Sequence, residues 1–177
     1  CYGFMECPMV TEYVGTDVIK SVCDKTSKFA RENYKDKQVD IYCKPSEELM
    51  NIPKFAKKYR EHFDVVFFSP PYYRLELYEG KNQSTSKYKT YEDWLDKYWE
   101  KTIQLCEYVL QPGGRLCYIV SGYGSDKTKT NNLSLVEDMN KITKKYFTYK
   151  RTLPMYNKNV HVTTHKETGE QIILFTK

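Results

Sequence analysis

The sequence lacks long apolar runs, paired-cysteine motifs and histidine clusters. No apolar stretch approaches the ~20 residues that a membrane-spanning helix needs, so we expect no membrane segment and no membrane partner. None of the six cysteines forms a C-x-x-C pair, and the three histidines lie apart from them, which argues against a zinc or other metal site. Cysteines inside expected strands and helices, with no signal peptide, indicate a reducing intracellular compartment, whether cytoplasmic, nuclear or viral.

The length and composition of the chain are those of one globular domain. Its 177 residues are enough for a hydrophobic core, and its apolar content of 40% and charged content of 29% are ordinary. The net charge of +5 weakly favours a polyanionic partner. The 17 tyrosines reflect either the coding bias of an AT-rich genome or aromatic contact with nucleic acid. Because the sequence starts at Cys1 rather than Met, we expect a single domain that is incomplete at its N-terminus.

An apolar strand runs directly into the sequence Ser-Pro-Pro-Tyr. Residues 65–68 form an unbroken apolar run, and Pro70 and Pro71 end it because proline has no N–H for a sheet ladder. Such a run is typical of a central strand in a parallel sheet that is covered on both faces. Since ligands bind beyond the carboxyl ends of such strands, we expect the chemistry at residues 69–72.

Hydrophobic periodicity predicts strands and helices that alternate along the chain. This alternation indicates an α/β fold with a mostly parallel sheet, and the last two strands must pair antiparallel because no helix separates them. The expected strands are 11–17, 38–42, 63–68, 115–121, 146–153 and 171–176, and the expected helices are 19–34, 46–59 with a break at Pro53, 91–110 and 133–144.

The residues Ser69, Pro70, Pro71 and Tyr72 resemble motif IV of S-adenosylmethionine-dependent methyltransferases that act on exocyclic amino groups of DNA bases. The resemblance implies that the Ser69 side chain and the Pro70 carbonyl each accept one N–H of the target amine, which frees the nitrogen lone pair. The two prolines would preorganise these acceptors, and Tyr72 would stack on a flipped-out base. The alternative is a Pro-Pro turn that only ends a strand.

The resemblance extends from about Glu12 to the end of the chain. It implies a Rossmann-like methyltransferase fold with an antiparallel final strand, and S-adenosylmethionine as cofactor. Asp17, at the tip of the first expected strand, would hold the ribose hydroxyls, with Val18 and Ile19 against the adenine. Asp17 is alternatively, or in addition, the N-cap of the following helix.

The third cofactor motif matches less closely. Here the chain has Lys44-Pro45-Ser46 in place of an acidic pair, and Ser46 is the nearest match for a residue that reads the adenine amino group. Its alternative role is that of a helix N-cap with Glu48 nearby.

The glycine-rich motif I of the family is absent from this sequence. That loop should lie roughly twenty residues before Asp17, yet only 16 residues precede Asp17, and the segment before Thr11 contains Gly3 as its one glycine. We therefore expect strand one and motif I to be missing from this chain and to be supplied by an upstream segment or by a second chain.

The loop after motif IV mixes aromatic and basic side chains. Tyr73, Arg74, Lys87 and Lys89 are candidates for contact with nucleic acid, and the alternative is a solvated polar loop. The resemblance implies methyl transfer to adenine N6 or cytosine N4, with DNA preferred over RNA by analogy. Glutamine methylation uses a similar loop that usually begins with Asn, so Ser69 counts against it. The rival hypothesis is a catalytically inactive methyltransferase-like module that binds nucleic acid or assists assembly.

Overall fold

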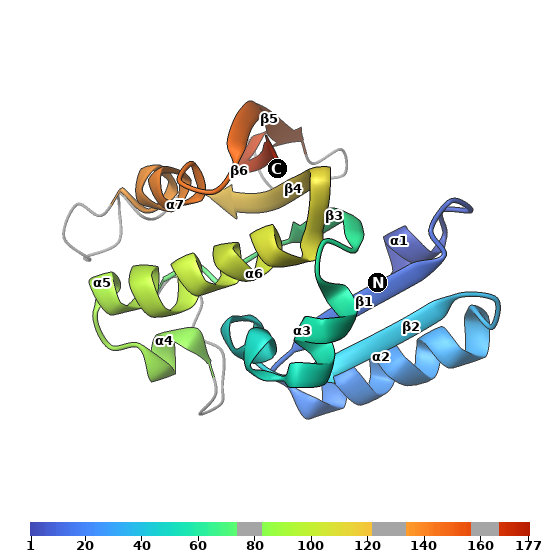
Figure 1. Cartoon of the computed structure of the whole chain (residues 1–177). Coiled ribbons are helices and arrows are strands. Elements are labelled where there is room, and N and C mark those ends of the chain that lie inside the picture. Colours follow the sequence, from blue (N-terminus) through green and yellow to red (C-terminus); the bar gives the residue numbers. More distant parts are fainter. Residues whose placement is uncertain (74–82, 122–133, 157–166) are drawn as a thin grey trace.

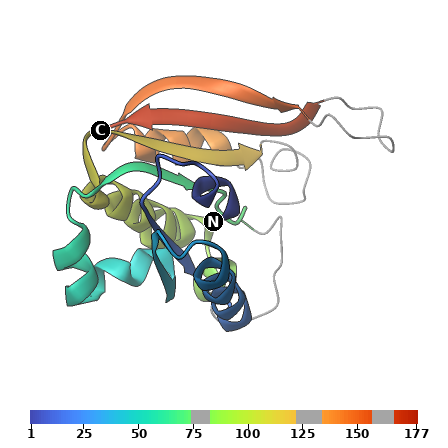
Figure 2. The same ribbon diagram turned by 90° about the vertical axis from the view of Figure 1, so that its right-hand side faces the viewer.

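The computed structural model describes residues 1–73, 83–121, 134–156 and 167–177 (Figures 1 and 2). Helices and strands alternate through most of the chain, as the periodicity predicts. The strands are β1 (Glu12–Asp17), β2 (Gln38–Cys43), β3 (Phe63–Phe68), β4 (Leu110–Ser121), β5 (Thr148–Tyr156) and β6 (Glu167–Thr176). The helices are α1 (Tyr2–Met5), α2 (Lys20–Asn33), η1 (Ser46–Asn51), α3 (Pro53–Tyr59), α4 (Ser84–Lys87), α5 (Tyr91–Trp94), η2 (Leu95–Glu100), α6 (Lys101–Val109) and α7 (Leu135–Thr143).

The strands form two separate sheets. One contains β1 and β2, paired in parallel, and the other has the order β3-β4-β6-β5. β3 and β4 are parallel, whereas β6 is antiparallel to both β4 and β5, which confirms the predicted ending of the fold. In Figure 1, β3 lies between the β1–β2 pair with α2 and the group of β4, β5 and β6 with α7.

The long helix that covers the larger sheet is continuous but not uniform. Thr90 caps its start by accepting a hydrogen bond from the Asp93 N–H at 3.1 Å. The turn formed by η2 is π-helical, and the helix ends at Val109, one residue earlier than expected. The Pro-Gly-Gly sequence at 112–114 lies inside β4 rather than ending the helix, and Gly113 adopts a φ of 81°, which favours glycine.

Two hydrophobic clusters hold these layers together. The larger one lies between the four-stranded sheet and the α5–α6 helix, and Trp94, Trp99 and Tyr118 are completely buried in it. The smaller one joins η1 and α3 to α6 through Leu49, Phe55, Tyr59, Leu105 and Val109. Among the described helices, none has the length and apolar character needed to cross a membrane.

The expectation that β3 is covered on both faces is wrong for the described part of the chain. β3 pairs with β4 on one edge, and no described strand pairs with its other edge. Val65 and Phe67 are 42% and 45% exposed, while Val66 and Phe68 pack against the main core. An apolar run by itself cannot reveal whether a second neighbour is present, which is why the sequence pattern misled here.

Candidate active site

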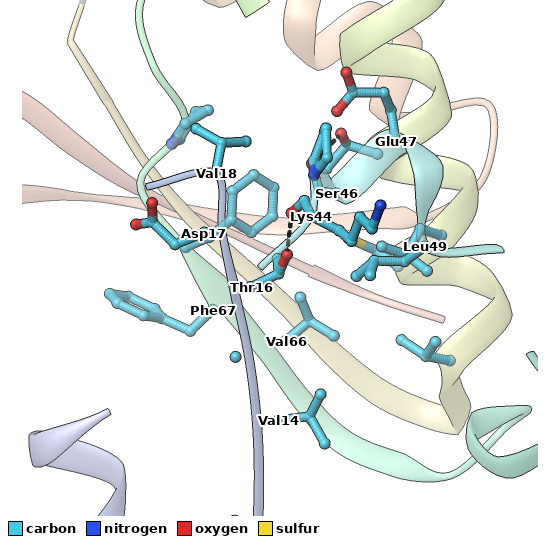
Figure 3. A pocket seen from close by; sticks show the side chains of 18 of the residues that line it. Val14, Thr16, Asp17, Val18, Lys44, Ser46, Glu47, Leu49, Val66 and Phe67 are labelled. Atoms are coloured by element: carbon cyan, nitrogen blue, oxygen red, sulfur yellow. Dashed lines mark hydrogen bonds between the residues drawn. The ribbon is translucent and has the colours of Figure 1, made fainter. Parts of the chain in front are cut away.

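A cavity of about 590 Å³ lies between β1 and β3 and reaches the carboxyl ends of both strands (Figure 3). It brings together two motifs that are about fifty residues apart in the sequence. A volume of this size is within the range of small-molecule sites in proteins. The predicted site residues that line it are Asp17, Val18, Ile19, Ser46, Ser69, Pro70 and Pro71.

Asp17 is the last residue of β1, and its carboxylate lies at the rim of the cavity (Figure 3). Its Oδ1 accepts a hydrogen bond from the Ile19 N–H at 2.7 Å, just before α2 begins. The Cys23 thiol donates to the Asp17 carbonyl at 3.4 Å and helps to fix the strand end. Ile19, and not Asp17, is the N-cap residue of α2, so the alternative role of Asp17 as that N-cap is wrong. The bond from the Ile19 N–H orients the carboxylate and leaves room for the predicted contact of its other oxygen with a diol.

Ser46 follows β2 and lies across the cavity from Asp17 (Figure 3). Its hydroxyl shares a hydrogen bond with the Thr102 hydroxyl of α6 at 2.9 Å. The alternative role as helix N-cap is wrong, because Pro45 occupies the cap position of η1 and no side chain caps it. Ser46 thus ties the end of the smaller sheet to the long helix at the cavity wall.

Glu47 is a cavity residue that sequence reasoning missed. Its side chain is only 5% exposed, and it pairs with Lys87 at 3.4 Å and accepts from the Tyr88 hydroxyl at 3.1 Å. Lys87 also pairs with Glu48. Burial lowers the pKa of Lys87, but the hydrogen bond to Glu48 and the charge of Glu47 outweigh it and leave that pKa above its ordinary value.

The sequence pattern places the adjacent Glu47 and Glu48 in a helix start, and no local pattern connects them to Lys87 about forty residues later. The ammonium of Lys87 is directed at these two carboxylates rather than at open solvent. Its predicted contact with nucleic acid would have to compete with them.

The Ser-Pro-Pro-Tyr segment leaves β3 at the carboxyl edge of the sheet. Ser69 is exposed, Pro70 is buried and Pro71 is half-buried. Tyr72 is 5% exposed and belongs to the main core, with its hydroxyl 3.4 Å from Glu170 Oε1. Ser69 and Pro70 therefore line the cavity, whereas the Tyr72 ring anchors the segment to the core and would have to turn outward to stack on a base.

The other candidates for nucleic-acid contact lie beside this anchor. The Tyr73 ring packs against Tyr91 and Trp94, with centroids 5.3 and 5.8 Å away, and its hydroxyl donates to the Lys89 carbonyl at 3.2 Å. Lys89 is exposed. Arg74 lies outside the described residues.

Solved structures of other proteins share the fold of this chain. No protein-family model matches the chain, and no curated protein matches it. Solved structures do match: the N-methyltransferase NodS from Bradyrhizobium japonicum WM9 aligns with a TM-score of 0.62 and 10% identity, over 99% of this chain and 79% of NodS. The chain has the Rossmann-like α/β fold of methyltransferases, as the resemblance in sequence implies.

Two further structures show the range of chemistry on this fold. TTHA0409 from Thermus thermophilus, assigned as a DNA modification methylase and solved with S-adenosyl-L-methionine, aligns with a TM-score of 0.50 and 18% identity. The alignment covers 76% of this chain and 53% of TTHA0409. The [4+2]-cyclase SpnF aligns with a TM-score of 0.57 and 13% identity, over 94% of this chain and 66% of SpnF. The fold by itself therefore does not define the reaction.

Proposed function

We propose that this protein binds S-adenosylmethionine and transfers its methyl group to an exocyclic amino group of a nucleic acid base, adenine N6 or cytosine N4. The observation that carries the proposal is the meeting of Asp17 and the Ser69–Pro70 pair at one cavity. These are the residues that the resemblance assigns to the cofactor ribose and to the target amine. Two solved structures with this fold are methyltransferases, and one is named as an N-methyltransferase.

The cavity residues fit the cofactor chemically. A carboxylate at the strand end, Asp17, suits a ribose diol, and the apolar side chains of Val18 and Ile19 suit an adenine face. Ser46 and Glu47 offer polar groups on the opposite wall, where they would face the adenine edge. When bound, S-adenosylmethionine supplies an electrophilic methyl group.

The chain's own contribution to the reaction is the positioning of the amine. The Ser69 hydroxyl and the Pro70 carbonyl would each accept one N–H, which opposes delocalisation of the nitrogen lone pair into the ring. Pro70 is buried, so its carbonyl is held by a rigid loop and needs little reorganisation. Tyr72 holds the same loop to the core, and we propose that its ring turns outward from this position when it stacks on the flipped-out base.

We propose DNA rather than RNA as the substrate. The motif resemblance supports this choice, and so does the assignment of TTHA0409 as a DNA modification methylase. The net charge of +5 and the aromatic and basic residues 73–89 are consistent with a polyanionic substrate. We propose that the protein acts inside the cell, where its nucleic acid substrate is present.

The second candidate function is a catalytically inactive module of the same fold that binds nucleic acid or assists assembly. The observation that favours it concerns the edges of β1 and β3 that face the cavity. In the described part of the chain, β1 pairs only with β2 and β3 only with β4, so neither of these edges has a strand partner. Without that neighbour, half of the wall around a cofactor would be open.

Calorimetric titration of the 177-residue protein with S-adenosylmethionine tests the first step of the proposal. We expect saturable binding that Asp17→Ala weakens at least tenfold, because a charged acceptor to two hydroxyls is lost. Asp36→Ala is the matched control, since Asp36 is exposed and lies beyond the far end of α2. Equal binding by all three proteins would remove Asp17 from the cofactor site.

Methyl transfer from labelled S-adenosylmethionine to DNA and to RNA tests the second step. We expect incorporation into DNA that Ser69→Ala reduces at least tenfold and that the exposed-site control Ser21→Ala leaves unchanged. Cofactor binding without transfer to either nucleic acid would support the inactive module instead. Full activity in Ser69→Ala would overturn the role assigned to Ser69.

A further inference from the structure

Two polar side chains on one wall of the cavity are buried but have spare hydrogen-bonding capacity. Gln83, which immediately precedes α4, and Tyr98 of η2 both line the cavity, and they are only 8% and 6% exposed. Neither the amide of Gln83 nor the hydroxyl of Tyr98 has a hydrogen-bond partner among the described residues. Polar groups buried to this degree are normally hydrogen-bonded, so their presence at one cavity indicates a ligand that supplies the partners.

The neighbouring polar side chains of this wall already have partners. The Ser46 hydroxyl shares its hydrogen bond with Thr102 at 2.9 Å. Glu47 pairs with Lys87 at 3.4 Å and accepts from the Tyr88 hydroxyl at 3.1 Å. A ligand on this side of the cavity would therefore find the amide and the phenol hydroxyl more available than the carboxylate.

Contacts at both ends of α4 hold Gln83 at this wall. At the first residue of the helix, the Ser84 hydroxyl accepts a hydrogen bond from Trp94 Nε1 at 3.1 Å, which fixes α4 to the buried start of the long helix. One turn later, the Lys87 N–H donates to the Gln83 carbonyl at 2.9 Å, and the Lys87 ammonium pairs with Glu47 of η1. The short helix α4 thus connects the long helix to the wall that carries Glu47, and it presents Gln83 to the cavity there.

The π-helical turn positions Tyr98 beside the same wall. Tyr98 lies four residues before Thr102, so both side chains are on the cavity side of the helix, and both line the cavity. Turns of this type are frequent at functional sites. Burial, with a smaller contribution from the charge of Glu47, raises the pKa of Tyr98. The hydroxyl therefore keeps its proton and can donate a hydrogen bond to a ligand.

We propose that Gln83 and Tyr98 select the adenine of the cofactor: the Gln83 side-chain carbonyl accepts from the exocyclic amine, and the Tyr98 hydroxyl donates to the adjacent ring nitrogen. An acceptor beside a donor is the complement of this edge of adenine, which presents an amine next to a ring acceptor. The inference rests on the proposed function for the identity of the ligand, and it assigns specificity for adenine to two residues that the sequence patterns did not single out.

The position of the pair favours the cofactor over the target base. Ser46 and Glu47 share this wall, which lies across the cavity from Asp17, the proposed ribose contact (Figure 3). In an adenine nucleoside the amine is on the side of the ring away from the ribose, so it would face this wall. The target amine would instead be held at Ser69 and Pro70. Because a target adenine or cytosine presents the same chemistry, the experiment has to separate the two sources.

Titration with two ligands tests the assignment. One is S-adenosylhomocysteine, and the other is its analogue in which purine, which lacks the exocyclic amine, replaces adenine. We expect the unchanged protein to bind S-adenosylhomocysteine about fivefold more tightly than the analogue, which is the effect of one hydrogen bond. Gln83→Leu should abolish this preference by weakening S-adenosylhomocysteine alone. Tyr98→Phe should weaken both ligands about equally, because both keep the ring nitrogen.

Matched variants outside the cavity control for indirect effects. Gln171 is exposed on β6, and Tyr108 of α6 donates to the Ala56 carbonyl at 3.1 Å; neither residue lines the cavity. Gln171→Leu and Tyr108→Phe should keep both affinities of the unchanged protein. The preference is a ratio of two affinities measured on one variant, so it does not depend on how much of that variant is folded.

The outcomes separate this inference from the proposed function. A preference that persists in Gln83→Leu would overturn the inference and leave the proposed function standing. An unchanged affinity for S-adenosylhomocysteine in Gln83→Leu, together with a raised KM for DNA in methyl transfer, would assign the pair to the target base and also overturn it. The expected preferences without any methyl transfer would support the inference and count against the proposed function alone. Failure of the unchanged protein to bind S-adenosylhomocysteine would overturn both.

Discussion

The two sheets of this protein differ sharply in how completely they are buried. In the four-stranded sheet, Leu116, Tyr118 and Val120 of β4 are buried along one face under the long helix. In the two-stranded sheet, by contrast, no residue of β1 or β2 is fully buried. The comparison shows that a parallel pair with one helix is only part of a core, because parallel strands are stable when both faces and both edges are covered.

Polar and apolar contacts both join the region of the smaller sheet to the rest of the molecule. Ser46 bonds to Thr102, Glu12 to His62, and Lys87 to Glu47 and Glu48. The apolar contacts of the smaller cluster around Phe55, which packs against Val14 and Val66, supply most of the attachment. The smaller sheet should therefore be the first part of the molecule to open.

The largest expected effect is the removal of a core side chain from the more buried region. Trp99 is fully buried, and its Nε1 donates to the Met139 carbonyl at 3.0 Å. We expect Trp99→Ala to lower the free energy of unfolding by about 3–5 kcal/mol, since a large cavity remains, whereas the Met139 carbonyl keeps its hydrogen bond from the Thr143 hydroxyl. Val14→Ala, in half-buried β1, should cost about 1 kcal/mol. Denaturant unfolding followed by far-ultraviolet circular dichroism measures both losses. Similar losses in the two variants would contradict the difference in burial between the two sheets.

The next effect concerns the ionic link between the two regions. Lys87→Met removes the cation that faces the buried Glu47, and we expect a loss of about 2 kcal/mol because that carboxylate stays desolvated without its partner. Glu48→Gln is the control, since the Glu48 side chain is 41% exposed and the loss of its charge should cost less than about 0.5 kcal/mol. Thermal unfolding compares the two variants. If they are equally stable, Glu47 does not depend on Lys87.

The cofactor contact of Asp17 lies at the end of the less buried sheet. If the proposed function holds, Asp17→Asn should weaken S-adenosylmethionine binding about tenfold and leave the unfolding midpoint nearly unchanged, because the amide oxygen can still accept from Ile19 N–H. Calorimetry and thermal unfolding separate the two effects. A large drop in stability with unchanged affinity would assign Asp17 to the helix start alone.

The smallest effect is a dependence of the smaller sheet on acid. Hydrogen bonds from Lys58 and then Tyr59 hold the pKa of Asp40 in β2 below its ordinary value of 3.8. A lowered pKa in the folded state contributes stability above the ordinary pKa, and this stability is lost as the pH falls through the lower, folded-state value. Because Asp40 is partly exposed, the contribution should be no more than about 1 kcal/mol.

Unfolding of Asp40→Asn and of the unchanged protein, compared from near-neutral to strongly acidic pH, measures this contribution. The two stability curves should differ near neutrality and converge at the acid end. Parallel curves across the whole range would show that Asp40 contributes nothing through its charge.

The alternation of strands and helices, the antiparallel ending and the position of Asp17 and Ser69 after strand ends could be predicted from the sequence, because each depends on local periodicity and on the rules of parallel sheets. The burial of Glu47 could not, since its partner Lys87 is forty residues away. The core position of Tyr72 was hidden for the same reason: its neighbours come from distant segments. The exposure of Val65 could not be predicted either, because an apolar run does not indicate whether β3 has a neighbouring strand on both edges.

The π-helical turn of the long helix has a consequence for how this element tolerates change. In a regular α-helix, residues five apart point about 140° away from one another, so Trp94 and Trp99 would face different directions. Here their rings are nearly parallel, at 8°, with centroids 6.5 Å apart, and both are fully buried. The wide turn acts as a one-residue insertion that realigns the two tryptophans. Deleting one residue within 95–100 would restore a regular helix and swing one indole into water, so the length of this segment is fixed even where its exposed residues are free to vary.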